Sequence, residues 1–247
     1  MTVVLSIAVS DMIVMAADSA VVFDFGDSRE YKLGRKAYMY PGVGCVTTWG
    51  SRVGNKIGPF LDRALENTHN PNVTDLANLT FEFLTNEYRP DELNLDNVGY
   101  HVAGFDSDQL PKLYHVFWGY DRDNSKRKNI REYKCNDHSP SNRKISFVYN
   151  GRNDLAETVI KTFLSEVESG GDTKLNLENR FDLILLADLT LRFSSEITPQ
   201  VSPPFIIYLL NRQNQSQRLT NNDLYPIDHE QVSNAIDRIQ SSGPNPA

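Results

Sequence analysis

Two short apolar runs open the chain, and two polar residues separate them. Residues 2–9 (TVVLSIAV) and 12–18 (MIVMAAD) are rich in strand-forming residues, and Ser10-Asp11 between them has the length and polarity of a tight turn. The pattern predicts an antiparallel hairpin that begins at the second residue. Because nearly every position of both runs is apolar, we expect this hairpin to lie in a sheet that is covered on both faces.

Farther along, blocks of strands alternate with pairs of helices. Short apolar runs predict the strands, and apolar positions at helical spacing predict the helices. The expected strands cover 43–49, 97–106, 111–121, 146–150 and 202–212, and the expected helices cover 74–88, 153–168 and 177–196, with another that begins near 50–51. Helix pairs between blocks of sheet predict a layered α+β fold with the helices on its outer faces.

No internal repeat and no linker divides the sequence. We therefore expect one domain over residues 1–212. A polar C-terminal extension over 213–247 follows it, with a short helix expected near 229–239.

The composition is that of an acidic globular protein. Of 247 residues, 40% are hydrophobic and 23% are charged, and the formal net charge is −7, which argues against a nucleic-acid or anionic-membrane partner. A basic segment, NSKRKNIR at 124–131, follows two aspartates and is interpreted as the solvated tip of a hairpin. No apolar stretch reaches the roughly 18 residues of a membrane helix, and no secretory signal is visible.

The two cysteines, Cys45 and Cys135, form no CxxC pair. A chain of this size does not need disulfides for stability, so Cys45 is interpreted as a free buried thiol. Reduced thiols and the missing signal together predict a cytoplasmic protein.

Sequence motifs of several common enzyme classes are missing. There is no HExxH, and the five histidines are scattered without the spacing of metal ligands. Neither a P-loop, nor a GxGxxG nucleotide-binding motif, nor a GxSxG nucleophile motif occurs. We expect neither a metal ion nor an organic cofactor.

The N-terminus itself carries a candidate nucleophile. If Met1 is removed, Thr2 presents a hydroxyl group and a free α-amine on one residue. An α-amine has an ordinary pKa of about 7.7–8.0, so it can accept the hydroxyl proton near neutral pH. This pairing is the N-terminal threonine form of nucleophile and base. Threonine is also a common second residue because it favours removal of Met1, so its position alone does not establish catalysis.

A carboxylate is expected close to Thr2. Asp18 ends the second apolar run, and antiparallel pairing brings it back to the start of the first. A buried carboxylate needs a partner because an unpaired buried charge is very costly. Lys32, Arg35 and Lys36, in the following segment YKLGRKAYMYPG, each offer a cation. A lysine beside the nucleophile would lower the pKa of its hydroxyl, and Asp18 would orient that lysine.

These features together resemble the proteasome β-subunit superfamily. The resemblance rests on Thr2, on the AADS element at 16–19, on a lysine ahead of a short strand, and on GCVTTWG at 44–50. It is specific over 2–50 and looser through about 212. It implies the αββα four-layer sandwich of N-terminal nucleophile hydrolases. Within the superfamily the chain is most similar to the bacterial proteasome homologues of the betaproteobacterial type, with the Anbu type as neighbour.

The resemblance assigns roles to three residues. Thr2 is the nucleophile and its amine the general base, while Asp18 orients a lysine. Lys36 is the chosen lysine, because KAYMYP matches the family's lysine, strand and turn. It lies two residues beyond the usual spacing, which keeps Lys32 and Arg35 open.

Other parts of the family's site are altered. The family's oxyanion donor is a backbone N–H at a glycine before the first helix; the matching position here is Thr48, with Gly50 as the alternative. Asn150-Gly151 stands where the family has a Ser-Gly pair near the nucleophile. The family's supporting Asp and Ser have no clean match in the loop after the fourth expected helix, where the hydroxyl-bearing residues are Ser194, Ser195, Thr198 and Ser202.

By this resemblance the chain is a threonine endopeptidase that cleaves peptide bonds through an acyl-enzyme on Thr2. The resemblance further implies a homo-oligomeric double ring, with heptameric rings favoured, whose chamber admits unfolded polypeptides or peptides, and an unidentified regulator as a further partner. Two alternatives stay open. One is a catalytically impaired ring-forming protein of the same fold, which the replacement at Asn150 favours. The other is an N-terminal nucleophile amidase that acts on a small substrate.

Overall fold

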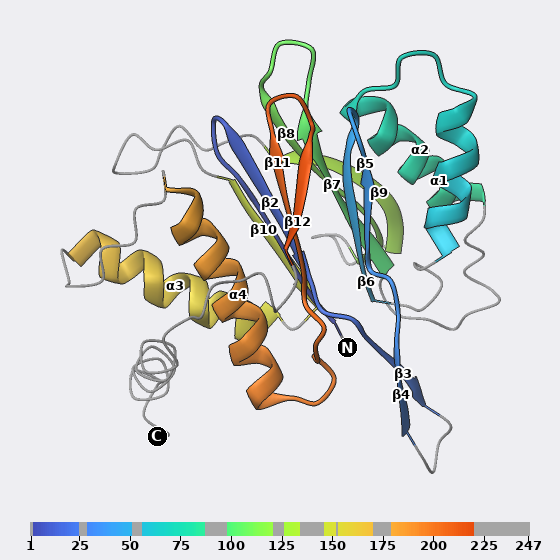
Figure 1. The fold of residues 1–247 in the computed structure, drawn as a ribbon. Coiled ribbons are helices and arrows are strands. Elements are labelled where there is room, and N and C mark those ends of the chain that lie inside the picture. Colours follow the sequence, from blue (N-terminus) through green and yellow to red (C-terminus); the bar gives the residue numbers. More distant parts are fainter. Residues whose placement is uncertain are drawn as a thin grey trace.

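Two five-stranded antiparallel sheets form the centre of the protein (Figure 1). The computed structural model describes residues 2–24, 29–50, 56–86, 98–120, 126–133, 146–151, 153–169 and 179–219. The first sheet has the strand order β10-β1-β2-β11-β12 and the second has the order β5-β6-β7-β8-β9. The strands of the first sheet are β1 (Val3–Ala8), β2 (Met12–Ala17), β10 (Ser146–Gly151), β11 (Ile206–Asn211) and β12 (Ser216–Leu219). Those of the second are β5 (Ala37–Tyr40), β6 (Gly44–Gly50), β7 (Val98–Phe105), β8 (Pro111–Tyr120) and β9 (Lys126–Tyr133).

The predicted N-terminal hairpin is confirmed as β1 and β2. Val4 lies opposite Ala17 in the antiparallel register, and the Val9 N–H donates to the Met12 carbonyl at 2.9 Å across the turn. β1 has β10 on one side and β2 on the other, and all six of its residues are buried. The nearly continuous apolar pattern therefore reflects a central strand that is covered on both faces, as expected.

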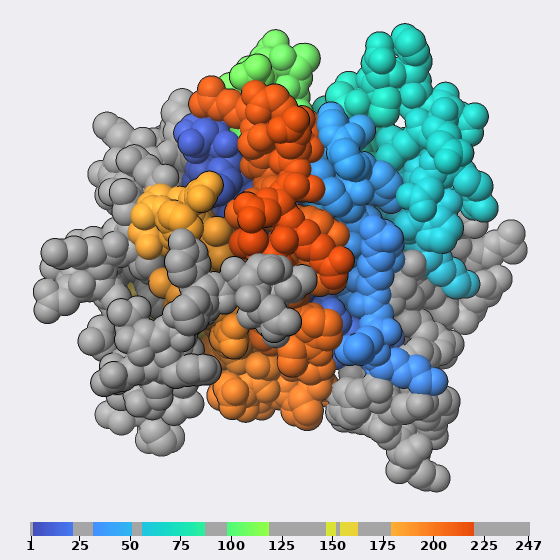
Figure 2. All heavy atoms as spheres, in the orientation of Figure 1, coloured from blue at the N-terminus to red at the C-terminus, as the bar shows by residue number. Residues whose placement is uncertain are grey.

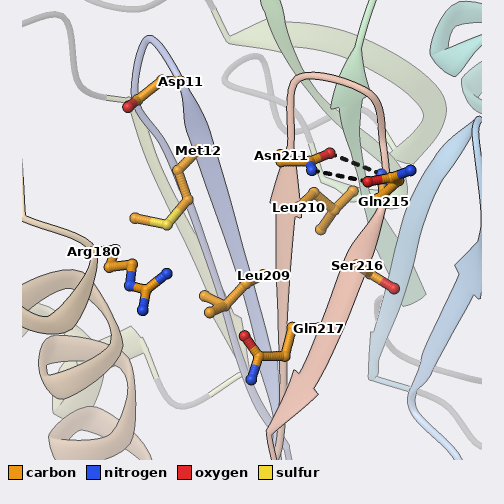
Figure 3. Close-up of a pocket in the computed structure, with 9 residues that line it drawn as sticks. All are labelled: Asp11, Met12, Arg180, Leu209, Leu210, Asn211, Gln215, Ser216 and Gln217. Atoms are coloured by element: carbon orange, nitrogen blue, oxygen red, sulfur yellow. Dashed lines mark hydrogen bonds between the residues drawn. The ribbon is translucent and has the colours of Figure 1, made fainter.

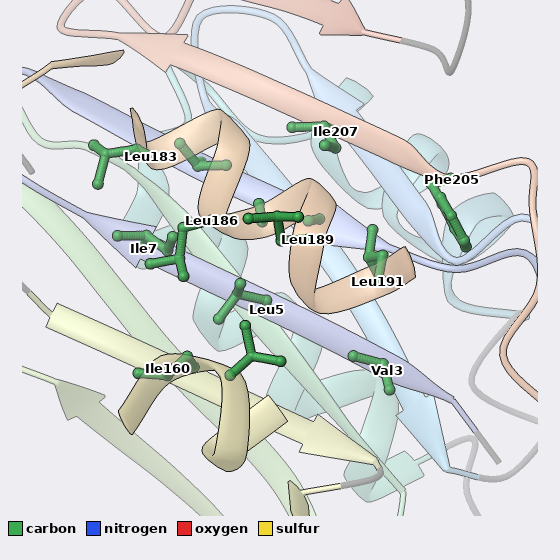
Figure 4. Packing of buried hydrophobic residues seen from close by; sticks show 14 of the residues in the cluster. Val3, Leu5, Ile7, Ile160, Leu183, Leu186, Leu189, Leu191, Phe205 and Ile207 are labelled. Atoms are coloured by element: carbon green, nitrogen blue, oxygen red, sulfur yellow. The ribbon is translucent and has the colours of Figure 1, made fainter. Parts of the chain in front are cut away.

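A pair of helices covers the outer face of each sheet (Figure 1). The helices are α1 (Ile57–Glu66) and α2 (Val73–Asn86) on the second sheet, and α3 (Asn153–Ser169) and α4 (Arg180–Ile197) on the first. Alternate residues of β1, namely Val3, Leu5 and Ile7, pack against α3 and α4 with Ile160 and Leu186 among their neighbours (Figure 4). This cluster fixes the inner strand that leads back to Thr2.

The intervening residues of β1 face the second sheet. Val4 and Ala8 belong to an apolar layer between the two sheets that also contains Cys45, Ala103 and Leu113. Cys45 is a buried free thiol in this layer, as expected. The result is a mixed α/β fold with two antiparallel sheets and helix pairs on their outer sides. No helix among the described residues is both long and apolar enough to cross a membrane.

An amide side chain links the two sheets at the end of β1 that lies far from Thr2. Asn214, in the turn between β11 and β12, accepts the Phe105 N–H at 2.6 Å and donates to the Phe105 carbonyl at 2.8 Å. The register places this turn near Met12, because Asn211 lies opposite that residue. On the face drawn in Figure 2, the β11–β12 hairpin lies at the surface between α4 and the β5–β6 strands.

Several elements differ from the sequence-based expectations. Of the basic segment, residues 126–131 lie in β9, an edge strand of the second sheet, rather than in a hairpin tip, and residues 124–125 lie outside the described residues. The first helix begins at Ile57 and not near residue 50, because β6 continues to Gly50, whose positive φ of 85° ends the strand. The strands β3 (Ala20–Asp24) and β4 (Arg29–Leu33) pair in a separate two-stranded sheet, which projects from the body (Figure 1).

Within the polar extension expected from residue 213, Ser216–Leu219 pairs with β11 as β12. The short helix expected at 229–239 and Cys135 lie outside the described residues.

Candidate active site

Thr2, Asp18 and Lys36 meet at one end of the two sheets. The Lys36 Nζ donates to Thr2 Oγ1 at 2.8 Å and to Asp18 Oδ2 at 2.8 Å. Their exposed fractions are 5% for Thr2, 0% for Asp18 and 3% for Lys36. An ammonium group that contacts both a hydroxyl oxygen and a carboxylate in a buried setting can stabilise negative charge on that oxygen.

The start of β1 and the end of β2 hold Asp18 in place. The Asp18 N–H donates to the Val3 carbonyl at 3.3 Å, and the Val3 N–H donates to Asp18 Oδ1 at 2.9 Å. The Ala20 N–H donates to Asp18 Oδ2 at 2.9 Å. Each carboxylate oxygen therefore accepts a backbone N–H, so the carboxylate has a fixed orientation before Lys36 is considered.

Lys36 reaches the site from the other sheet, just before β5 begins at Ala37. Burial raises the pKa of the Asp18 carboxyl and lowers that of Lys36, while the ion pair between them acts in the opposite direction on each. A lysine whose pKa is lowered by desolvation gives up a proton more readily than one in water. The arrangement is suited to proton movement at Thr2.

The other two cations considered from the sequence lie elsewhere. Lys32 is exposed and stands opposite Val21 in the β3–β4 hairpin. Arg35 donates to the Ala37 carbonyl at 3.1 Å, and its guanidinium lies 4.7 Å from the centre of the Tyr38 ring. Of the three, Lys36 is the cation that the described structure places at Thr2.

The two positions considered for the oxyanion donor differ in backbone bonding. The Thr48 N–H donates to the Lys36 carbonyl at 2.9 Å. Gly50 lies two residues after Thr48, so its N–H points to the same edge of β6, the edge that faces β5. The pairing of β5 with β6 ends at Ala37 and Thr47, before it reaches Gly50. Of the two, Gly50 is therefore the one whose N–H this ladder does not occupy.

Asn150 contacts a histidine that the sequence analysis did not select. The Asn150 Oδ1 lies 2.7 Å from His101 Nε2, and His101 Nδ1 lies 2.8 Å from Ser6 Oγ. Burial lowers the pKa of His101 to about 4, so the ring is neutral at physiological pH. One sequence feature could have indicated this contact. Ser6 in VVLSIA and His101 in VGYHVAGF are each a polar residue within an otherwise apolar strand.

Gly151 lies directly against the backbone of the candidate nucleophile. A Cβ atom at Gly151 would come within 1.6 Å of the Thr2 carbonyl oxygen, and the φ of Gly151 is 102°. A side chain at this position is therefore excluded on two grounds, contact and backbone conformation. This requirement accounts for a glycine in the Asn150-Gly151 pair.

Three of the four hydroxyls considered at the end of α4 and in the loop after it have local partners. Ser194 donates to the Thr190 carbonyl and Ser195 to the Arg192 carbonyl, both within α4. The Gln200 N–H donates to Thr198 Oγ1 at 3.4 Å. The loop touches the site through backbone, since the Ser202 carbonyl accepts the Ser19 N–H at 3.2 Å, and Ser19 Oγ in turn donates to the Pro204 carbonyl.

A surface cavity of about 430 Å³ lies at the opposite end of the first sheet (Figure 3). Its lining includes Met12, Asn211 and Arg180. Met12 begins β2 and Asn211 ends β11, whereas Thr2 adjoins the other end of these strands. The cavity is thus separate from the cluster around Thr2.

Comparison with known proteins shows which solved structures share the fold of this chain. No protein-family model matches the chain, and no curated protein matches it. Among solved structures, the Anbu (Gly-1) mutant from Hyphomicrobium sp. strain MC1 has a TM-score of 0.62 at 13% identity, over 100% of this chain and 99% of that one. The Anbu complex from Pseudomonas aeruginosa, described as a helical assembly, has a TM-score of 0.62 at 17% identity, over 99% and 98%. Anbu (ancestral beta-subunit) from Yersinia bercovieri has a TM-score of 0.62 at 13% identity, over 97% and 93%.

These structural neighbours extend over the whole chain. They are Anbu proteins, the type named as a neighbour from the sequence motifs, and one of them is described as an ancestral beta-subunit. The identities are low, so the likeness establishes the fold and not the activity. The closer similarity to the betaproteobacterial type stays a prediction.

Proposed function

We propose that this protein is a threonine endopeptidase of the N-terminal nucleophile class, with Thr2 as its nucleophile. The observation that carries the proposal is the contact of Lys36 Nζ with Thr2 Oγ1 at 2.8 Å, in a buried site where Asp18 holds the same nitrogen. A solvated strand-edge lysine would instead have its ammonium group in water.

The reaction proceeds through an acyl-enzyme once residue 1 has been removed. The free amine of Thr2 takes the hydroxyl proton as Oγ1 attacks the carbonyl carbon of the scissile peptide bond. Lys36 stabilises the developing charge on Oγ1, and the backbone N–H of Gly50, or of Thr48 after rearrangement, stabilises the carbonyl oxygen. The amine then gives its proton to the leaving nitrogen as the C–N bond breaks. Water hydrolyses the ester on Oγ1 and regenerates Thr2.

The proposal extends to the fold family and the assembly. We assign the two sheets with their helix pairs to the αββα four-layer sandwich of N-terminal nucleophile hydrolases. We further propose a cytoplasmic homo-oligomer with heptameric double rings, which encloses the sites and admits unfolded polypeptides or peptides, with an unidentified regulator docking on it. The description of the Pseudomonas aeruginosa Anbu complex as a helical assembly supports self-association, although not this ring geometry.

The test is intact mass of the protein before and after incubation with a peptide epoxyketone. This reagent requires both the hydroxyl and the free amine of an N-terminal threonine. The chain should be expressed behind a cleavable fusion partner that leaves Thr2 first, and the uncleaved fusion, in which the Thr2 nitrogen is an amide, is the matched control. One inhibitor should add to the Thr2-first chain, and none to the control or to Thr2→Ala. A Thr2-first chain that never reacts would reject the proposal.

A non-catalytic ring-forming protein of the same fold is the second candidate. The bonding of Asn150 to His101 and of the Thr48 N–H to the Lys36 carbonyl favours it, because each occupies a group that the family's site directs to catalysis. This candidate predicts that the protein forms a ring and that the intact mass of its Thr2-first chain does not change on incubation with the epoxyketone.

A further inference from the structure

His101 links the two sheets beside the candidate active site. It lies on β7 of the second sheet, fully buried, with Nδ1 2.8 Å from Ser6 Oγ on β1 and Nε2 2.7 Å from Asn150 Oδ1 on β10. Because an amide oxygen only accepts, Nε2 carries the hydrogen and Nδ1 accepts from the Ser6 hydroxyl. One neutral ring therefore holds two neighbouring strands of the first sheet against the second.

The strand register places this link next to Thr2. Asn150 lies opposite Val4, and residues that lie opposite one another share a face of the sheet. Thr2 and Ser6, two residues before and after Val4, are the diagonal neighbours of Asn150 on that face. Gly151, the next residue along, lies against the Thr2 carbonyl.

The contact between Thr2 and Lys36 is also a contact between sheets. Thr2 leads into β1 of the first sheet, and Lys36 leads into β5 of the second. Their 2.8 Å separation therefore depends on how far apart the sheets lie at this end. Hydrogen bonds have donor–acceptor distances of about 2.7–3.2 Å, so a shift of roughly 1 Å between the sheets would break this one.

We propose that His101 is a positioning residue for the candidate active site. By binding Ser6 and Asn150 it sets the separation of the sheets near Thr2, and so holds the Lys36 Nζ at the Thr2 Oγ1. The catalytic consequence rests on the proposed function, whereas the distance between these two atoms can be measured without any activity.

The test compares variants of the Thr2-first chain by crystallography and by epoxyketone kinetics. His101→Leu removes both bonds, His101→Gln keeps a donor for Asn150 alone, and Ser6→Ala removes one bond with little change in volume. The matched control is Asn214→Gly, which removes a link between the same two sheets at the far end from Thr2.

In His101→Leu the distance from Lys36 Nζ to Thr2 Oγ1 should exceed 3.5 Å, the limit of a hydrogen bond, whereas Asn214→Gly should keep it. The first-order rate of covalent modification should fall about tenfold or more in His101→Leu with the inhibition constant within about twofold, and His101→Gln should be intermediate. Should His101→Leu fail to fold, the same distance and rate in His101→Gln and Ser6→Ala decide the matter.

An unchanged Lys36–Thr2 distance in the histidine variants, or rate losses no larger than that of Asn214→Gly, would overturn the positioning role. A wild-type chain that does not react, together with a lengthened distance in His101→Leu, would reject the proposed function and leave the positioning role standing.

Discussion

Lys36 and Thr2 are 34 positions apart in the sequence and meet at 2.8 Å across the gap between two sheets. Neither sheet forms the site by itself, because Thr2 and Asp18 adjoin strands of the first sheet and Lys36 adjoins a strand of the second. The site therefore forms only when the two sheets pack against each other. Its geometry depends on how the core packs. Substitutions of the glycine, histidine and amide residues around it should therefore change the reactivity of Thr2 or the stability of the fold.

Removing the lysine should cost both reactivity and stability. In Lys36→Met the epoxyketone reaction of the Thr2-first chain should slow about a hundredfold or more, because no cation then stabilises the negative charge that develops on Thr2 Oγ1. Asp18, 0% exposed, would be left as an unpaired buried charge, which costs about 3–5 kcal/mol in the free energy of unfolding. Urea denaturation measures this loss.

The double variant Asp18→Asn with Lys36→Met separates the two effects. It removes the stranded charge but sets an amide NH2 group against one of the two backbone N–H donors, Val3 or Ala20, so stability should return in part while reactivity stays low. Equal stability of Lys36→Met and the double variant would contradict the buried ion pair.

Gly151→Ala should displace the nucleophile. The new Cβ would overlap the Thr2 carbonyl at 1.6 Å, so the start of β1 must move and the Lys36 contact should lengthen. Gly42→Ala is the matched control, because Gly42 also has a positive φ, 78°, but nothing lies within 4 Å of its Cβ position. Gly42→Ala should lose roughly 1–2 kcal/mol of stability from backbone strain alone and keep its reactivity. Similar reactivity of both variants would show that the contact is unimportant.

Asn214 should stabilise the packing of the sheets without affecting chemistry. In Asn214→Gly both bonds to the Phe105 backbone are lost in a buried setting, which should lower the free energy of unfolding by about 1–3 kcal/mol. Glycine tolerates the φ of 52° at this position, whereas Asn214→Ala should lose about 1 kcal/mol more. Thermal or urea unfolding of both variants measures these losses of stability. If Asn214→Gly were as stable as the wild type, the two hydrogen bonds would have no net effect on stability.

The part of the site that depends on local pattern could be predicted from the sequence. The hairpin of 2–9 and 12–18 brings Asp18 beside the start of β1 because antiparallel register follows from a two-residue turn. The choice of Lys36 over Lys32 and Arg35 came from the family resemblance alone. It depends on how two sheets pack, which no local pattern of residues specifies.

The histidine link could not have been predicted from spacing. Ser6 and His101 are 95 positions apart and belong to different sheets. Each was visible as a polar residue on the inward face of an apolar strand, but such a residue does not identify its partner. The part of the basic segment in β9 was predicted wrongly for a related reason: a run of charged residues is compatible with an edge strand as well as with a turn, and charge alone does not distinguish the two.

His101 should make the protein less stable as the pH falls. Its pKa is about 4 in the fold, because burial disfavours the charged ring, against 6.5 ordinarily. Between these values the unfolded chain binds more protons than the folded one, so stability is full above about pH 6.5 and declines as the pH drops toward 4. The contribution is on the order of 3 kcal/mol.

The comparison with His101→Gln isolates this term. Burial raises the pKa of Asp18 and Asp188, and a raised carboxyl pKa acts in the opposite sense over part of the same range. Both carboxyls are present in wild type and variant, so the difference between the two chains reports His101 itself. Urea unfolding at intervals from pH 7 to 4 should show a wild-type advantage that shrinks as the pH falls. A constant difference across that range would mean that the ring does not titrate as a neutral buried histidine, and the hydrogen-bonded link to Ser6 and Asn150 would have to be reassigned.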